Sequence, residues 1–187
     1  MTQHTFDLIA FDGDDTLWHN ERSYRMGRDR FHRLLTTAGV ALSEEEIDAH
    51  VNRTELQNIS YFGYGVSSFT LSLIETAIAV TAGQVAGRDL QGLIDLARQM
   101  LTEEVELFGS AREAVTTLAA SYPLMLVTNG DLLHQTSKVD RSGLREHFRF
   151  VEVVGTKTTA MYASILARLG VEAGRFLMVG NSMRSDV

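Results

Sequence analysis

The chain has 187 residues, with 17 Lys and Arg against 24 Asp and Glu, so its formal net charge is −7. Hydrophobic residues make up 44% of it, which is too many for a disordered chain and enough for a buried core. The acidic balance argues against a nucleic-acid partner, and the lack of cysteine excludes disulfides and thiolate sites. No stretch is apolar for long enough to cross a membrane, and no leader precedes the first apolar run, so we expect a cytoplasmic protein.

The first half of the sequence predicts one strand followed by helices. The apolar run Phe6–Phe11 is typical of a buried strand. From about Trp18 to about Arg98 the periodicity is helical only, with helices expected at Glu21–Ala38, Ser43–Tyr61, Ser67–Val85 and Leu90–Glu104. Ser43 and Glu46 form a capping-box pattern, which predicts where the second of these helices begins. The block predicts a small helical domain, residues 18–98, inserted after the first strand.

In the second half, helical and strand patterns alternate. We expect helices at Ser110–Ala120 and Thr158–Leu169, and strands at Leu124–Val127, Phe150–Val154 and Phe176–Val179. Gly170 stands where a left-handed C-terminal cap belongs. This alternation is typical of an α/β fold with a doubly wound, Rossmann-like parallel sheet, here built from residues 1–17 and 99–187.

The chemically informative segment is Asp12-Gly13-Asp14-Asp15-Thr16, directly after the first strand. Ligands of open parallel sheets bind beyond the carboxyl ends of the strands. Three carboxylates within four residues repel one another, and a bound divalent cation is the simplest way to offset that repulsion. Because all the ligands would be oxygen atoms, Mg²⁺ is favoured over zinc. An acidic turn that solvates the strand end is the alternative. A calcium loop of the EF-hand type does not fit, because Thr16, Leu17 and Ser23 occupy its key positions.

Polar residues also follow each later strand. They are Thr128, Asn129 and Gly130 after the second strand, Lys157 after the third, and Asn181 and Asp186 after the fourth. Taken singly, Thr128 could be a strand-end cap, Lys157 a solvated lysine and Asp186 a helix cap. Together they place a hydroxyl, an ammonium and a further carboxylate at the same sheet edge as the acidic segment. Thr128 and the backbone N–H groups beside it are suited to holding a phosphate oxygen.

These segments resemble the four motifs of the haloacid dehalogenase (HAD) superfamily, in order. The matching segments are LIAFDGDDT, LMLVT, Lys157 and FLMVGNSMRSD. The helical insertion resembles the C1-type cap domain of that superfamily, and the resemblance covers essentially the whole chain.

The resemblance implies a role for each matching residue. Asp12 is the expected nucleophile, which forms an aspartyl-phosphate, and Asp14 the general acid and base. Thr128, Asn129 and Gly130 are expected to bind the phosphoryl group, and Lys157 to offset its charge. Mg²⁺ is expected on the Asp12 carboxylate, the backbone carbonyl of Asp14 and the fourth motif.

Two residues depart from the pattern. Asn181 stands where an aspartate is usual, so we expect Asp186 to be the main acidic metal ligand, with Asn181 supporting it. Asp15 replaces a frequent glycine and is expected either to stabilise the loop or to lie at the surface. Lys138 is a rival for the role of Lys157, but its helical surroundings favour a solvated position.

We therefore expect a Mg²⁺-dependent phosphatase of a small phosphorylated metabolite, acting as a monomer or homodimer without nucleic-acid or membrane partners. Asp14 favours phosphate-ester hydrolysis, since the dehalogenases themselves typically lack it. The alternatives are a HAD-type phosphomutase or dehalogenase, and a non-catalytic phosphate-binding or receiver-like module.

The Tyr61–Gly65 segment is expected either to form part of the substrate wall or to pack the core of the cap.

The end of the sequence gives one further expectation. Proteins that resemble this chain continue with at least one more helix and strand beyond the fourth motif. We expect the C-terminal part of the core to be missing here, which would leave the strand Phe176–Val179, placed beside the first strand, with a bare edge.

Overall fold

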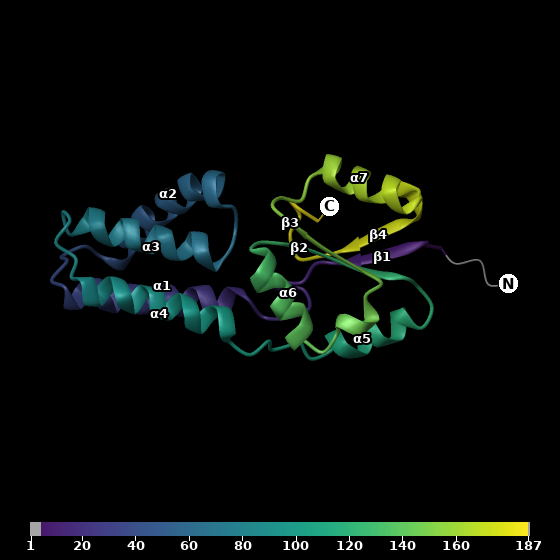
Figure 1. The fold of residues 1–187 in the computed structure, drawn as a ribbon, viewed down its shortest axis with the longest axis horizontal. Helices are drawn as coiled ribbons and strands as arrows, with labels where there is room; N and C mark the ends of the chain where they lie inside the picture. The colour runs from purple at the N-terminus through teal and green to yellow at the C-terminus, as the bar shows by residue number, and fades with distance from the viewer. Residues whose placement is uncertain (1–4, 187) are drawn as a thin grey trace. The chain divides into compact units, whose positions relative to one another are not determined.

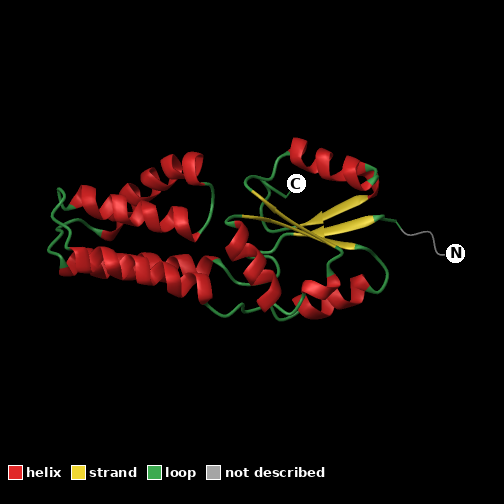
Figure 2. Cartoon of the chain, in the orientation of Figure 1, coloured by secondary structure: helices red, strands yellow, loops and turns green. Residues whose placement is uncertain are grey.

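The computed structural model describes residues 5–186, which divide into two compact units. One unit consists of residues 5–20 and 104–186, and the other of Glu21–Glu103. Figure 1 shows the course of the chain, and Figure 2 shows that all strands belong to the first of these units.

The first unit is built on a four-stranded parallel sheet. Its strands are β1 (Leu8–Phe11), β2 (Leu124–Asn129), β3 (Phe150–Val154) and β4 (Phe176–Val179), in the order β3-β2-β1-β4. β1 pairs along its whole length with β4, from Leu8 opposite Phe176 to Phe11 opposite Val179. The predicted parallel sheet, and the position of the last strand beside the first, are confirmed.

Helices cover both faces of this sheet (Figure 1). α5 (Ala111–Ala119) and α6 (Leu132–Arg141) lie on one face and α7 (Thr159–Leu169) on the other, while the short helices η1 (Arg145–His147) and η2 (Ala173–Arg175) precede β3 and β4. Ile9 and Phe11 pack in the cluster beneath α5 and α6. Leu8 and Ala10 pack in the cluster beneath α7. β1 is apolar throughout because both of its faces are buried.

The second unit consists of four helices, as predicted. They are α1 (Glu21–Thr37), α2 (Glu44–Phe62), α3 (Val66–Val80) and α4 (Gly87–Thr102). Their apolar faces form one core, with Phe31, Leu35 and Leu73 fully buried. The predicted capping box is present, since Ser43 Oγ accepts from the N–H of Glu46 and the Glu46 carboxylate accepts from the N–H of Ser43.

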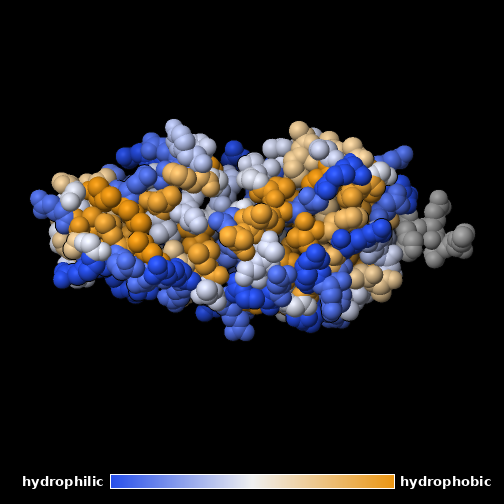
Figure 3. Space-filling view, in the orientation of Figure 1, coloured by the Kyte–Doolittle hydropathy of each residue, from blue (hydrophilic) through white to orange (hydrophobic). Residues whose placement is uncertain are grey.

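Among the described residues, no helix is both long and apolar enough to cross a lipid bilayer. Figure 3 shows apolar side chains at the surface of each unit, interspersed with hydrophilic ones.

In the helical unit, one expected helix boundary is wrong, and so is one of the two alternatives for Tyr61–Gly65. α3 ends at Val80 rather than Val85, because Ala82 (φ 50°) and Gly83 (φ 80°) adopt left-handed conformations that break the helix. The aromatic residues of the Tyr61–Gly65 segment do not pack the core of this unit. Tyr61, Phe62 and Tyr64 are all exposed, Tyr61 by 82%.

Gly170 ends α7 with a left-handed backbone (φ 67°, ψ 31°), as its position in the sequence predicts. Gly170→Ala should lower the free energy of unfolding by about 1 kcal/mol, because a Cβ penalises this conformation. Gly174→Ala is the matched control, since neither glycine has an atom within 4 Å of an added Cβ and only Gly170 has a positive φ. Urea unfolding measures both, and equal losses would contradict this account of the cap.

Candidate active site

The acidic segment forms a tight loop at the carboxyl end of β1. The N–H of Asp12 donates to the carbonyl of Val179 at the end of β4 (2.8 Å). Asp15 adopts φ 56°, and its Oδ1 accepts from the N–H of Asn20 (2.9 Å), which closes the loop. The position between the two aspartates requires glycine, because a Cβ on Gly13 would lie 2.5 Å from the indole ring of Trp18.

Lys157 joins Asp12 to Asp186. Its Nζ lies 2.6 Å from Oδ1 of Asp12 and 2.6 Å from Oδ1 of Asp186. The three residues come from the β1 loop, the segment before α7 and the segment after β4, and all three are buried. Two carboxylates therefore converge on one ammonium. The structure thus brings together three of the residues that the sequence singled out.

Burial controls the protonation of Asp12. It raises the pKa of this carboxyl from 3.8 to about 6, and the negative charge of Asp186 adds to the rise. The ammonium of Lys157 opposes the shift by favouring the charged form. Asp12 is therefore an anion at neutral pH, although the buried charge is costly to the fold.

The side chain of Asp14 belongs to a second cluster. Its Oδ1 accepts from Nε1 of Trp18 (2.6 Å) and from Nζ of Lys138, and its Oδ2 accepts from Nε2 of Gln135 (2.9 Å). Lys138 Nζ also donates to Oδ1 of Asn20 (2.8 Å). The expectation that Lys138 is solvated is wrong, because its side chain is buried on the inner face of α6 and paired with Asp14.

The sequence analysis missed the other members of this cluster, Trp18, Asn20 and Gln135. The available signal was spacing, since Gln135 and Lys138 are three residues apart and therefore share one face of α6.

Thr128 and Asn129 are the last residues of β2, paired with Val153 and Val154, rather than part of a loop after it. Thr128 is fully buried, and neither its Oγ1 nor Oδ1 of Asn129 has a hydrogen-bond partner within residues 5–186. Unpartnered buried oxygens are unfavourable in a fold unless a ligand satisfies them. Gly130 adopts φ 131°, and its N–H donates to the carbonyl of Val154 (3.3 Å).

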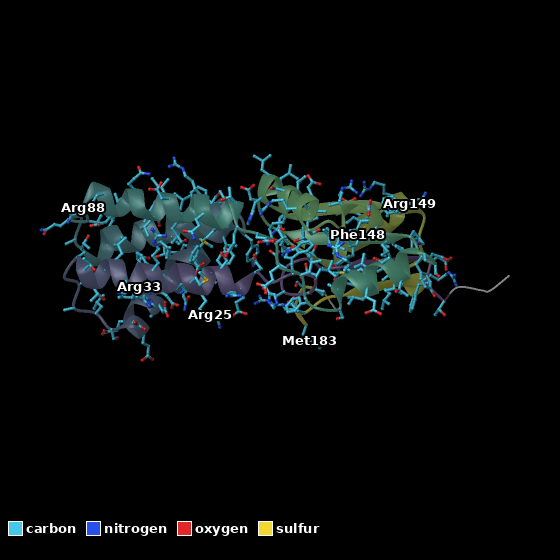
Figure 4. The ribbon with its side chains drawn as sticks, turned by 90° about the horizontal axis from the view of Figure 1, so that it is seen from below. Arg25, Arg33, Arg88, Phe148, Arg149 and Met183 are labelled. Carbon is cyan, nitrogen blue, oxygen red and sulfur yellow. The ribbon has the colours of Figure 1, made fainter. Side chains whose placement is uncertain are left out.

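The fourth motif follows β4. Oδ2 of Asp186 accepts from the N–H of Ser182 (3.0 Å), so the segment folds back on itself. A Cβ on Gly180 would overlap the Asp186 carboxylate, so the turn requires glycine. Asn181 is exposed, and Met183 points outward from the unit (Figure 4).

Tyr162 is a neighbour of the acidic pair that the sequence analysis did not identify. Burial raises the pKa of its hydroxyl, and the negative charges of Asp186 and Asp12 raise it further. Its Oη donates to the carbonyl of Ser185 (3.4 Å), which links α7 to the segment that carries Asp186.

The donor set is suited to a hard cation but does not form a complete cage. Within the described part of the chain, no three His, Cys, Asp or Glu side chains converge in an arrangement that could hold a metal. The Asp12 and Asp186 carboxylates do lie together, at the two sides of Lys157 Nζ. Two carboxylates completed by neutral oxygens and water fit Mg²⁺, which is usually held by one or two carboxylates.

Comparison with known proteins identifies the family. Residues 6–187 match the model of the haloacid dehalogenase-like hydrolases, so the chain belongs to this family and is an enzyme. Among curated relatives, human N-acylneuraminate-9-phosphatase is 25% identical over 96% of this chain and 75% of the relative. The rat protein of the same name is 24% identical over the same shares of both chains.

Solved structures agree with this assignment. A haloacid dehalogenase-like hydrolase from Xanthomonas campestris is 40% identical, with a TM-score of 0.92 over 100% of this chain and 78% of that one. The HAD-hydrolase YfnB from Bacillus subtilis, solved with bound magnesium, is 20% identical. It has a TM-score of 0.67 over 98% of this chain and 83% of its own, which shows a shared fold.

The raised pKa of Asp12 has a consequence for stability. A carboxyl whose pKa is about 6 when folded and 3.8 when unfolded contributes stability below pH 3.8 that is lost as the pH rises through 6. In metal-free protein at pH 7, Asp12→Asn should therefore raise the free energy of unfolding, by up to about 3 kcal/mol, while Asp186 still pairs with Lys157.

This gain should shrink as the pH falls toward 4. Glu113→Gln, which removes an exposed carboxylate from the first turn of α5, should lower the free energy of unfolding by at most about 1 kcal/mol at pH 7. Urea unfolding of both variants between pH 4 and 8 measures the effect. A destabilised Asp12→Asn protein at pH 7 would contradict the assigned cost of the buried charge.

Proposed function

We propose that this enzyme is a Mg²⁺-dependent phosphatase that hydrolyses a small phosphorylated metabolite through an aspartyl-phosphate intermediate. The observation that carries the proposal is the contrast between two aspartates only two residues apart. Asp12 is buried against Lys157 and Asp186, whereas Asp14 is turned toward Trp18, Gln135 and Lys138. Titratable groups placed in different environments are suited to different roles, here nucleophile and general acid–base.

In the first step, a carboxylate oxygen of Asp12 attacks phosphorus as the bond to the ester oxygen breaks, and Asp14 protonates that oxygen. In the second step, Asp14 removes a proton from water, which attacks the aspartyl-phosphate and restores the Asp12 carboxylate. Lys157 offsets the charge shared by the phosphoryl group and Asp12. The unpartnered oxygens of Thr128 and Asn129 support a role for the end of β2 in binding the phosphoryl group.

The resident cation would be held by the carboxylates of Asp12 and Asp186 and the backbone carbonyl of Asp14, with Asn181 completing the set. When bound, it supplies positive charge to the phosphoryl oxygens. In this assignment Asp14 contributes its backbone rather than its carboxylate, which agrees with the orientation of its side chain toward Lys138.

The names of the relatives support a phosphate ester as substrate. The curated relatives are phosphatases named for an N-acylneuraminate 9-phosphate, which becomes the first compound to test here. The match to a hydrolase family favours catalysis over the receiver-like module. The same proposal includes three further predictions. We expect Glu21–Glu103 to act as a cap that selects the substrate, and the exposed Tyr61, Phe62 and Tyr64 to contact it. We also expect a cytoplasmic location.

Asp12→Asn should abolish phosphate release from N-acylneuraminate 9-phosphate and from a panel of sugar, nucleotide and short-acid phosphates with added Mg²⁺. The substitution replaces one carboxylate oxygen and removes the nucleophile while keeping the shape of the side chain. Glu113→Gln should retain the wild-type rate. Retention of more than a few per cent of that rate by Asp12→Asn would exclude the proposed mechanism.

Asp14→Asn should lower kcat by roughly 10²–10⁴ for an alkyl phosphate, because the proton shuttle is lost while the backbone carbonyl remains. A substrate with a good leaving group, such as p-nitrophenyl phosphate, needs less protonation and should lose less rate in the first step. The ratio kcat/KM, which reports the steps up to formation of the aspartyl-phosphate, makes this comparison for both substrates. Equal losses would count against Asp14 as general acid.

A further inference from the structure

The side chain of Asp14 is held by three donors from two separate segments of the chain. Trp18 Nε1 belongs to the loop after β1, whereas Lys138 Nζ and Gln135 Nε2 come from α6, more than a hundred residues later. Asn20 accepts a second bond from Lys138, which fixes the ammonium between two oxygens. Gln135 Nε2 also donates to the carbonyl of Asn129 (2.9 Å), which connects the cluster to the end of β2.

The burial of Lys138 argues that this contact is more than a surface ion pair. Lys138 is 5% exposed and Gln135 is 3% exposed. Lysine is almost never fully buried unless it is paired, because removing an ammonium from water costs several kcal/mol. A lysine that only tethered α6 to the loop would serve as well at the surface. Here the buried charge is directed at the one carboxylate that must exchange a proton.

The donors also determine which oxygen of Asp14 exchanges that proton. A carboxylate offers about four acceptor positions, two on each oxygen. On Oδ1 both are occupied, by Trp18 and Lys138, whereas Oδ2 accepts only from Gln135. Oδ2 is therefore the oxygen with room for a proton.

We propose that Lys138 and Gln135 are positioning residues that hold the Asp14 carboxylate in one orientation, with Oδ2 as its proton-carrying oxygen. The inference rests on the proposed phosphatase function. In the first step the proton on Oδ2 passes to the ester oxygen as the phosphorus–oxygen bond breaks. In the second step Oδ2 of the resulting carboxylate receives a proton from the attacking water, which restores the carboxylic acid. Lys138 and Gln135 act through Asp14 and take no part in the bond changes themselves.

The test compares Lys138→Met with Arg141→Met, which removes an exposed cation from the same last turn of α6. For an alkyl phosphate, Lys138→Met should lower kcat by between about tenfold and 10²-fold, because a displaced catalytic group loses its alignment with the reacting atoms. For p-nitrophenyl phosphate the loss in kcat/KM, which reports the first step, should be several-fold smaller, and KM should change little for either substrate. Arg141→Met should match wild type with both.

Lys138→Arg should recover part of the lost rate, since it keeps the charge. Gln135→Met leaves the ion pair intact and should shift the ratio of the two rates in the same direction, by a smaller factor, even if Lys138→Met folds poorly. Equal losses with both substrates would assign Lys138 to stability alone and overturn the inference.

A second readout needs neither metal nor substrate. Trp18 is the sole tryptophan, its indole N–H donates to Asp14, and Lys138 Nζ lies 6.0 Å from the centre of its ring. Indole emission responds to charges and hydrogen bonds at the ring. In metal-free protein, Lys138→Met should therefore change the emission maximum or intensity, and Arg141→Met should not. An emission spectrum of Lys138→Met identical to wild type would contradict the cluster itself.

These experiments distinguish failure of the proposed phosphatase function from failure of the positioning role of Lys138 and Gln135. A wild-type protein with no phosphate release on any substrate would exclude the proposed function, and the role of Lys138 and Gln135 with it. Wild-type activity that Asp12→Asn abolishes, combined with equal losses in Lys138→Met, would leave the function standing and overturn only the positioning role.

Discussion

The ammonium group of Lys157 is almost completely removed from water, and the fold tolerates it because Asp12 and Asp186 lie on either side of it. This triad ties the loop after β1 to the segment before α7 and to the segment after β4. The same burial raises the pKa of Asp12, so the fold bears the cost of a charged carboxylate that would be more stable protonated. Opposing demands of this kind are typical of sites where activity limits stability.

A second buried cation, Lys138, gives Asp14 a different electrostatic environment from that of its neighbour Asp12. Asp12 and Asp14 are two residues apart, yet each is held by its own lysine, Lys157 from the segment before α7 and Lys138 from α6. Gly13 makes this divergence possible, since its missing side chain admits the Trp18 ring that donates to Asp14. Two carboxylates with separate partners can carry separate protonation states, and the proposed two-step mechanism depends on that separation between nucleophile and acid.

The parallel sheet explains why both clusters lie at one edge. All four strands run in the same direction, so the segments that follow β1, β2 and β4 leave the sheet on the same side. The close pairing of β1 with β4 then aligns Asp12 with the Val179 carbonyl and sets the start of the fourth motif beside the acidic loop. The site therefore depends on strand order rather than on closeness in sequence.

The sequence by itself determined the sheet strands, the four inserted helices, the caps at Ser43 and Gly170, and the candidate residues Asp12, Lys157 and Asp186. These features depend on apolar periodicity and on local hydrogen-bonding residues, which are visible in a single chain. The tertiary structure decided where α3 ends, that Tyr61, Phe62 and Tyr64 are exposed, and that Lys138 is buried against Asp14. A helical pattern shows which residues share a face of a helix. It does not show that Lys138 pairs with Asp14, 124 residues earlier, because that contact forms only when α6 packs against the sheet.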